Sequence, residues 1–178
     1  MSLITRSYRL RAYPNGAQRR LLDRWFGATR WLWNTALEIR SEAYRTCGLS
    51  LTGNDLSRWL TQWKRTAGHE WLVEVPATAL TQCLRDQDRA FSRFFGRHAR
   101  YPRFKAKGGR QGLRFQGAGT PWRSGVLRLP KLGVLKLAEE LPDVERPDMV
   151  SLLRDASGAY YVSFCAKVPR TLRPGTGE

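Results

Sequence analysis

The chain has 178 residues, and its 42% hydrophobic content is enough to bury a core, which excludes a disordered polycation. Its 31 Lys and Arg residues against 15 Asp and Glu give a net charge of +16, which is typical of a protein that binds a polyanion, most commonly nucleic acid. A membrane surface is the rival partner, but no apolar run approaches the roughly 20 residues of a spanning helix and no signal peptide opens the chain, so we expect a cytoplasmic protein without a membrane partner.

The positive charge is concentrated in particular regions. The fifty residues between Asp88 and Glu139 contain no acid and thirteen Lys or Arg, and the first 22 residues contain five Arg and no acid. Such regional charge indicates a binding groove rather than a uniformly charged coat.

The first elements in chain order are a strand and a long helix. Residues 2–13 alternate apolar and polar side chains, which predicts a half-buried strand with a basic outer face. Asn15 is a plausible N-cap, and apolar residues at three- and four-residue spacings predict a helix from Ala17 to about Thr46. We expect Gly27 to bend or divide this helix.

Two further helices follow. Thr52 and Asp55 have the spacing of a capping box, which predicts a helix that Gly68 stops. Pro76 suits the first turn of another helix, which carries apolar residues from Leu80 to Phe95.

The rest of the chain is predicted to form short strands separated by Gly and Pro. Strands are predicted at 113–115, 126–129 and 134–137, and a final hairpin pairs "MVSLLR" with "YYVSFCAKV" around "DASG". The order strand, helices, strands predicts an α+β fold in which the first strand pairs with late strands in a small β-barrel, with the helices inserted between them.

The residues do not suggest catalysis or metal binding. Cys47, Cys83 and Cys165 are scattered without paired spacing, so we interpret them as buried free thiols rather than zinc ligands. Asp86 and Asp88 are two apart and diverge on a helix, so they cannot share a metal or a proton. We therefore expect no catalytic residue and no metal site, and we interpret the chain as a binding protein.

Six ordered blocks resemble a known family. They begin with "YRLRAYPNGAQRRLLDRWFGATRWLWNTALEIRSEAY" and continue with "GLSLTGNDLSRWLTQWK", "WLVEVPATALTQCLRDQDRAFSRFF", "YPRFKAKGGRQGLRFQG", "LRLPKLGVLKL" and "YYVSFCAKV". Over roughly residues 6 to 168 the chain resembles TnpB proteins, the RNA-guided nucleases of bacterial insertion sequences and relatives of type V CRISPR effectors.

The resemblance implies a wedge domain, an OB-like β-barrel, with a helical recognition domain inserted in it. The implied boundaries are 1–13 for the first wedge strand, 14–109 for the recognition domain, 110–169 for the remaining wedge strands and 170–178 for a linker. The implied partners are a guide RNA and target double-stranded DNA, where base pairing reads the sequence and the protein reads a short target-adjacent motif. Such a protein would be associated with the bacterial nucleoid.

The resemblance also implies a RuvC-like nuclease part, either downstream or on a separate chain. The RuvC carboxylates that hold the metal ions are missing from this sequence, so we expect no DNA cleavage by this chain alone. We accordingly expect no cofactor in this chain, and Mg²⁺ only in the nuclease part.

Three sets of candidate site residues follow from the basic run "RYPRFKAKGGR" and from the resemblance. Tyr101, Pro102 and Phe104 are expected to pack or stack in a hinge between helices and strands, with Phe104 as its buried anchor. The expected phosphate contacts are Arg6, Arg9, Arg11, Arg100, Arg103, Lys105, Lys107, Arg110, Arg114 and Lys131. The resemblance places target-adjacent DNA at Gly53, Ser57, Ala77, Thr78 and Thr81, with Gln116 in the loop after the basic run.

Two alternatives stay open at this point. The helical block could place a helix in a major groove, as a stand-alone DNA-binding transcriptional regulator does. The charge also fits a structural RNA-binding protein of the ribosomal kind.

Overall fold

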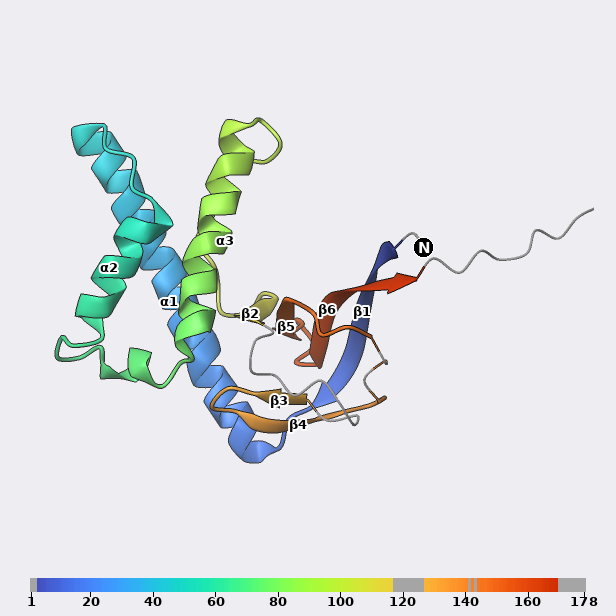
Figure 1. Cartoon of the computed structure of the whole chain (residues 1–178). Helices are drawn as coiled ribbons and strands as arrows, with labels where there is room; N and C mark the ends of the chain where they lie inside the picture. The colour runs from blue at the N-terminus through green and yellow to red at the C-terminus, as the bar shows by residue number, and fades with distance from the viewer. Residues whose placement is uncertain (1–2, 117–126, 141, 143, 170–178) are drawn as a thin grey trace, which may run out of the picture.

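A computed structural model gives the structure of the protein, and it describes residues 3–116, 127–140, 142 and 144–169. The predicted tail at 170–178 and part of the strand at 126–129 lie outside the described residues. The helical elements are α1 (Gly16–Cys47), α2 (Gly53–Trp63), the short 3₁₀ helix η1 (Glu70–Val73) and α3 (Ala77–Phe95). The strands are β1 (Leu3–Tyr13), β2 (Gln111–Gln116), β3 (Leu127–Leu129), β4 (Gly133–Leu137), β5 (Met149–Arg154) and β6 (Tyr160–Pro169), as Figure 1 shows.

Helix α1 is a single element of 32 residues. Asn15 caps it in a capping box with Gln18, and Gly48 ends it with a φ of 64°, a conformation that favours glycine. The expected division at Gly27 is wrong. The flanking residues Phe26 and Ala28 are both buried, so packing on the helix offsets the weak helix propensity of one glycine.

The capping box predicted for α2 is confirmed. The Thr52 side chain accepts a hydrogen bond from the Asp55 backbone N–H, and the Asp55 carboxylate accepts one from the Thr52 N–H at 2.9 Å. The hydroxyl of Thr52 also donates to Asp55, and these bonds hold the pKa of the Asp55 carboxyl below its ordinary value.

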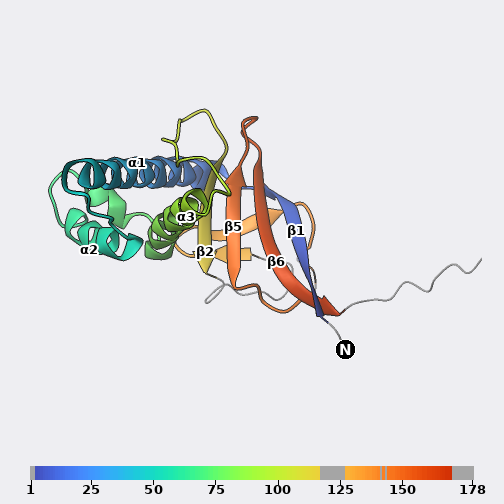
Figure 2. The same ribbon diagram turned by 90° about the horizontal axis from the view of Figure 1, so that it is seen from above.

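The six strands form one antiparallel sheet in the order β2-β5-β6-β1-β4-β3. The sheet is strongly bent and barrel-like (Figure 2). In this order β2 and β3 are its edge strands. Strand β1 pairs with β6 from Leu3↔Pro169 to Ala12↔Tyr160, which confirms that the first strand joins the late ones. The α+β class is thus confirmed, because three helices lie between β1 and its partners in the sequence.

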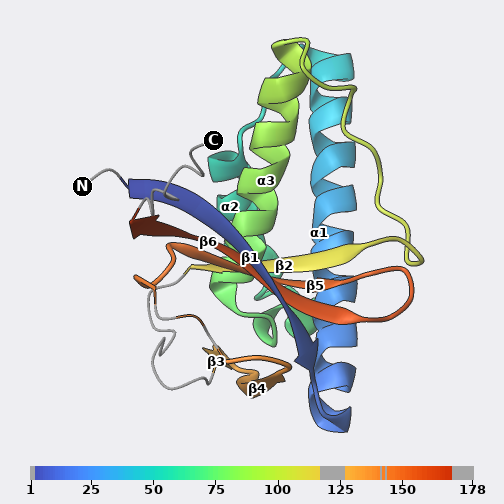
Figure 3. The same cartoon turned by 90° about the vertical axis from the view of Figure 1, so that its right-hand side faces the viewer.

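One hydrophobic core joins the helices to the sheet. Four residues at paired positions of neighbouring strands are buried: Leu10, Leu113, Leu152 and Val162. They lie on the same side of the sheet, because alternate residues of a strand share one face. The same cluster includes Trp25 of α1, so helices and sheet are packed together, with the helices beside the β2 edge (Figures 2 and 3). No helix in the described part of the chain is long and apolar enough to cross a membrane.

The cysteine interpretation is correct for only one residue. Cys83 is buried on α3, and burial raises the pKa of its thiol to about 11. Cys47 and Cys165 are exposed, because Cys47 ends α1 and Cys165 lies on the outer face of β6. None of the three forms a disulfide.

Candidate nucleic-acid interface

A basic segment links α3 to β2, and we call residues 96–110 the strap. It runs beside α1 in Figure 3. The indole N–H of Trp33 donates to the Arg103 carbonyl at 2.9 Å, and the Asn34 amide both accepts from the Lys105 N–H at 2.8 Å and donates to its carbonyl at 3.1 Å. Two polar side chains of α1 therefore fix the backbone of the strap, leaving most of its side chains exposed.

The expectation that Phe104 anchors the strap is wrong. Its side chain is 63% exposed, whereas Pro102 is buried. The backbone bonds from α1 to residues 103 and 105 replace the packing that a buried ring would have supplied. Tyr101 contacts Phe91 and Phe94 edge to face, and its hydroxyl shares a hydrogen bond with that of Ser41 at 2.8 Å.

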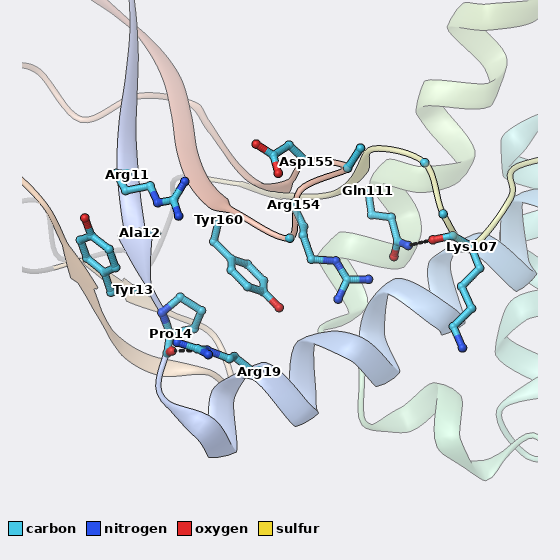
Figure 4. Close-up of a pocket in the computed structure, with 14 residues that line it drawn as sticks. Arg11, Ala12, Tyr13, Pro14, Arg19, Lys107, Gln111, Arg154, Asp155 and Tyr160 are labelled. Atoms are coloured by element: carbon cyan, nitrogen blue, oxygen red, sulfur yellow. Dashed lines mark hydrogen bonds between the residues drawn. The ribbon is translucent and has the colours of Figure 1, made fainter.

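The strap ends at a hollow of about 440 Å³, which we call the basic pocket (Figure 4). Three segments far apart in the sequence meet there: the β1–α1 corner, the strap at Lys107–Gly109 and the β5–β6 turn. Its basic lining residues are Arg11, Arg19, Lys107 and Arg154. Four basic residues thus line one site whose lining contains a single carboxylate, that of Asp155, and among these four Arg154 is ion-paired with Asp23.

Local contacts hold these side chains in place. Arg11 donates to the Tyr161 hydroxyl at 3.0 Å, and Arg19 donates to the Pro14 carbonyl at 2.9 Å. Burial by itself would lower the pKa of Arg154, but hydrogen bonds with Tyr160 and Asp23 raise it, so this guanidinium stays charged.

The Asp155 carboxylate is committed to its own turn. It accepts hydrogen bonds from the Ser157 hydroxyl at 2.6 Å and from the Ala159 N–H at 2.9 Å. The Ser157 bond, then the Ala159 bond, lower the pKa of Asp155, and Arg11 adds to this shift. The carboxylate therefore shapes the turn, and the pocket keeps a net positive charge that suits phosphate oxygens.

The outer face of β1 continues this charge away from the pocket. The guanidinium carbons of Arg9 and Arg11 lie 4.0 and 5.0 Å from the centre of the Tyr161 ring. Arg6 belongs to the opposite face of β1, where its guanidinium carbon lies 5.4 Å from the Tyr8 ring. Cation–π contacts of this kind orient arginines without consuming their N–H donors.

The structure separates the expected phosphate contacts into two groups. Arg6, Arg9, Arg100, Arg103, Lys105, Lys107 and Arg110 have exposed side chains, and Arg11 is half-buried. Arg114 is instead paired with Asp86 of α3, and Lys131 donates to the Val73 carbonyl at 2.6 Å. These last two side chains connect the sheet to the helices, so they are less available to a ligand.

The six expected DNA-contact positions do not form one cluster. Gly53 is buried, and its N–H donates to the Asp88 carboxylate at 2.9 Å, which places the start of α2 beside the middle of α3. Asp88 is eleven residues beyond Ala77, or about 16 Å along the helix axis. Ala77 and Thr78 are exposed at the start of α3, while Ser57 and Thr81 are half-buried. Gln116 is exposed but is the last residue of β2, not a loop residue.

Sequence reasoning missed two members of the basic pocket, Arg19 and Arg154. Arg19 belongs to the acid-free first 22 residues, and that signal could have identified it. Arg154 adjoins the turn "DASG", and only the register of β1 with β6, in which Ala12 pairs with Tyr160, shows that this turn lies beside the β1–α1 corner. Among the described residues no group of three or more His, Cys, Asp or Glu could hold a metal ion.

Comparisons with known proteins identify relatives of this chain. Residues 1–48 match the family of OrfB proteins from IS605-type insertion sequences, described as a helix-turn-helix domain. The chain is 32% identical over 180 residues to a candidate RNA-guided DNA endonuclease of Streptomyces pristinaespiralis, and the match covers 99% of this chain and 45% of that protein. A second candidate RNA-guided DNA endonuclease, InsQ of Escherichia coli K12, is 29% identical over 160 residues, which cover 88% of this chain and 39% of InsQ.

A shorter relative is the virulence protein VsdF of Salmonella dublin, which is 35% identical over 107 residues, 55% of this chain and 90% of VsdF. The chain spans less than half the length of the two endonuclease relatives. In the matched segment, residues 3–48 contain a strand and one uninterrupted helix. The two helices of a helix-turn-helix are therefore not both inside that segment.

Proposed function

Because this chain belongs to the TnpB family of insertion-sequence proteins and matches the N-terminal portion of longer relatives, we propose that it binds a guide RNA and target-adjacent DNA in an RNA-guided system. One observation carries the proposal: basic side chains from three distant segments line the basic pocket, and three of them, Arg11, Arg19 and Lys107, form no ion pair with a described carboxylate. Such convergence gives a phosphate backbone a fixed position, because phosphate contacts set register while base pairing supplies sequence.

In this proposal the sheet is the wedge domain and the helices are the recognition domain. The pairing of β1 with β6 supports it, since both ends of the helical insertion return to the same sheet. The implied boundaries, 1–13 with 110–169 for the wedge and 14–109 for recognition, lie close to the end of β1 and the start of β2. The basic pocket lies where the two parts meet, so an RNA held there would contact both.

The target-adjacent DNA would lie along α2 and α3. The distance of about 16 Å between the Gly53 contact and the start of α3 equals roughly five base-pair steps of 3.4 Å. Exposed Thr78 and Ala77 would face bases at one end. Gly53 would contribute only its lack of a side chain, which leaves room for the DNA, because its N–H already donates to Asp88.

The proposal involves no metal in the described residues, because no cluster of possible ligands fits one. Any Mg²⁺ chemistry would belong to a RuvC-like nuclease part carried elsewhere. With RNA and DNA as partners, the protein would act at the bacterial nucleoid.

The test is to purify the chain, sequence the RNA that copurifies and measure its affinity against salt. We expect one structured RNA species, with log affinity falling by roughly 0.7 to 0.9 per neutralised phosphate for each unit of log salt. The combined variant Arg11→Gln, Arg19→Gln and Lys107→Gln should bind at least about tenfold more weakly in 0.15 M salt, with a slope reduced by about 2 to 3.

A control variant with the same charge change isolates the pocket: Arg58→Gln, Arg65→Gln and Arg128→Gln are exposed positions outside its lining. If both triple variants lose affinity equally, the pocket is not the site. Copurified ribosomal RNA would favour the structural RNA-binding alternative, and sheared genomic DNA would favour the regulator.

A further inference from the structure

A second hollow lies at the other end of the strap, between the C-terminal halves of α1 and α3. We call it the aromatic pocket; it measures about 650 Å³. Its wall contains rings in mutual contact: Phe91 and Phe95 stack at 6.3 Å between centroids, and Phe94 meets Phe95 at 5.2 Å and Tyr101 at 5.2 Å. Tyr44 and Leu49 line it from α1 and the α1–α2 loop.

Several of these side chains are exposed to solvent. Phe95 is 70% exposed, Tyr44 68% and Leu49 57%, and all three line the same hollow. Adjacent exposed apolar residues in a hollow indicate a binding site, since water is a poor partner for them.

The charges near this pocket select the kind of ligand. Arg93, Arg97 and Arg100 are exposed next to its lining residues in the sequence, and within the described residues none of them forms an ion pair. The nearby carboxylates are already paired, Asp88 with Arg40 and Glu42 with Arg45, both at 2.6 Å. Aromatic walls whose sequence neighbours are unpaired arginines complement a base and its phosphates.

The strap connects this pocket to the basic pocket. Tyr101 is fixed at Ser41 and Lys105 at Asn34, positions about 10 Å apart along α1. Exposed cations follow the strap from one pocket to the other: Arg97, Arg100, Arg103, Lys105 and Lys107. A flexible single strand could follow such a track, whereas a rigid duplex could not place a base inside the aromatic pocket.

From these contacts we infer that the aromatic pocket binds an unpaired nucleobase of a single-stranded segment whose phosphates follow the strap. The inference rests on the proposed function, because it assigns a second contact to the same nucleic acid.

Arg97 offers an independent observation. Its φ of 58° is in the left-handed region, where glycine is favoured and most other residues are strained. An arginine at the end of α3 therefore costs stability that a glycine would recover. A contact between its guanidinium and phosphate would account for that cost.

The test uses a twelve-nucleotide single strand of mixed sequence, made as DNA and as RNA, with the matching duplex as comparison. Phe95→Ala should weaken single-strand binding about tenfold, as expected from losing one base stack, and change duplex binding less than twofold. Phe95→Leu keeps the apolar surface without the ring and should lose most of the same affinity. Trp59→Ala removes an exposed ring outside the pocket and should have no effect. Whichever strand binds more tightly, DNA or RNA, identifies the source of the base.

Arg97→Gly provides the second readout. It should raise the thermal midpoint by relieving the left-handed strain and weaken single-strand binding about threefold, two changes that a purely structural residue would not combine. Full single-strand affinity in Phe95→Ala would overturn the inference while leaving the proposed function intact. So would a dimer of the parent protein that Phe95→Ala abolishes in sedimentation velocity. A parent chain that binds no RNA, single strand or duplex would overturn the proposed function itself.

Discussion

The two pockets at the ends of the strap use arginine in opposite ways. In the aromatic pocket, Arg40 is 6% exposed and its guanidinium donates to Asp88 at 2.6 Å. In the basic pocket, Arg154 is also paired, with Asp23, but Arg19 and Lys107 are exposed and no described carboxylate pairs with them. The comparison teaches that a charge count does not locate a binding site: buried, paired cations stabilise the fold, and exposed, unpaired cations are available to a ligand.

The difference extends to the ligand that each pocket suits. The basic pocket is built from polar turns and strand ends, and phosphate oxygens can satisfy its donors. The aromatic pocket has an ion pair at its base and rings on its walls, so it offers stacking surface rather than free donors. Loss of the ion pair at the base of the aromatic pocket should therefore reduce the stability of the fold, whereas loss of the exposed cations of the basic pocket should reduce phosphate binding.

The largest effect is expected for Asp88→Ala. This change leaves the buried Arg40 without its partner and removes the acceptor of the Gly53 N–H, so the free energy of unfolding should fall by about 3 kcal/mol. Urea denaturation followed by circular dichroism measures it. In the control, Glu74→Ala removes the partner of Arg24 in an exposed pair and should cost less than about 1 kcal/mol. Equal losses in the two variants would contradict the distinction between structural and available charges.

A smaller effect is expected where α2 meets α3. A Cβ on residue 53 would lie 2.3 Å from an Asp88 carboxylate oxygen, so Gly53→Ala should destabilise the protein by about 1 to 3 kcal/mol. Gly27→Ala is the matched control, because its Cβ would meet only the end of the Arg30 side chain, at 3.9 Å. That variant should stabilise α1 by roughly 0.5 to 1 kcal/mol. Thermal unfolding of both proteins compares them, and a stable Gly53→Ala would mean that α2 can move away from α3.

The smallest effects are expected in the strap between the pockets. Asn34→Ala removes two hydrogen bonds to Lys105 and should cost about 1 kcal/mol, with faster tryptic cleavage in the strap. Phe104→Ala should change the free energy of unfolding by less than about 0.5 kcal/mol, because its ring is mostly exposed. Urea denaturation measures the change in the free energy of unfolding of both variants, and timed tryptic digestion measures cleavage of the strap. A loss of 3 kcal/mol in Phe104→Ala would restore the ring as the anchor.

The local elements could be predicted from the sequence. Period-2 alternation identified β1, and helical spacing with Asn15 and the Thr52–Asp55 box identified the helices, because capping and periodicity depend on neighbours within a few residues. The pairing of β1 with late strands also followed from the sequence, since an isolated strand cannot satisfy its backbone. Charge regions indicated a nucleic-acid surface.

Which basic residues are available to a ligand, and which aromatic residues are buried, depends on tertiary contacts that the sequence does not reveal. Periodicity cannot show that Arg114 forms an ion pair with Asp86 or that Lys131 donates to the Val73 carbonyl. It also cannot show that Arg154 and Arg11 line the same pocket at the end of the strap. Nor could it show that Trp33 and Asn34 fix the strap backbone and leave Phe104 exposed. These outcomes depend on contacts between residues about 30 to 140 positions apart, and no local pattern encodes such distances.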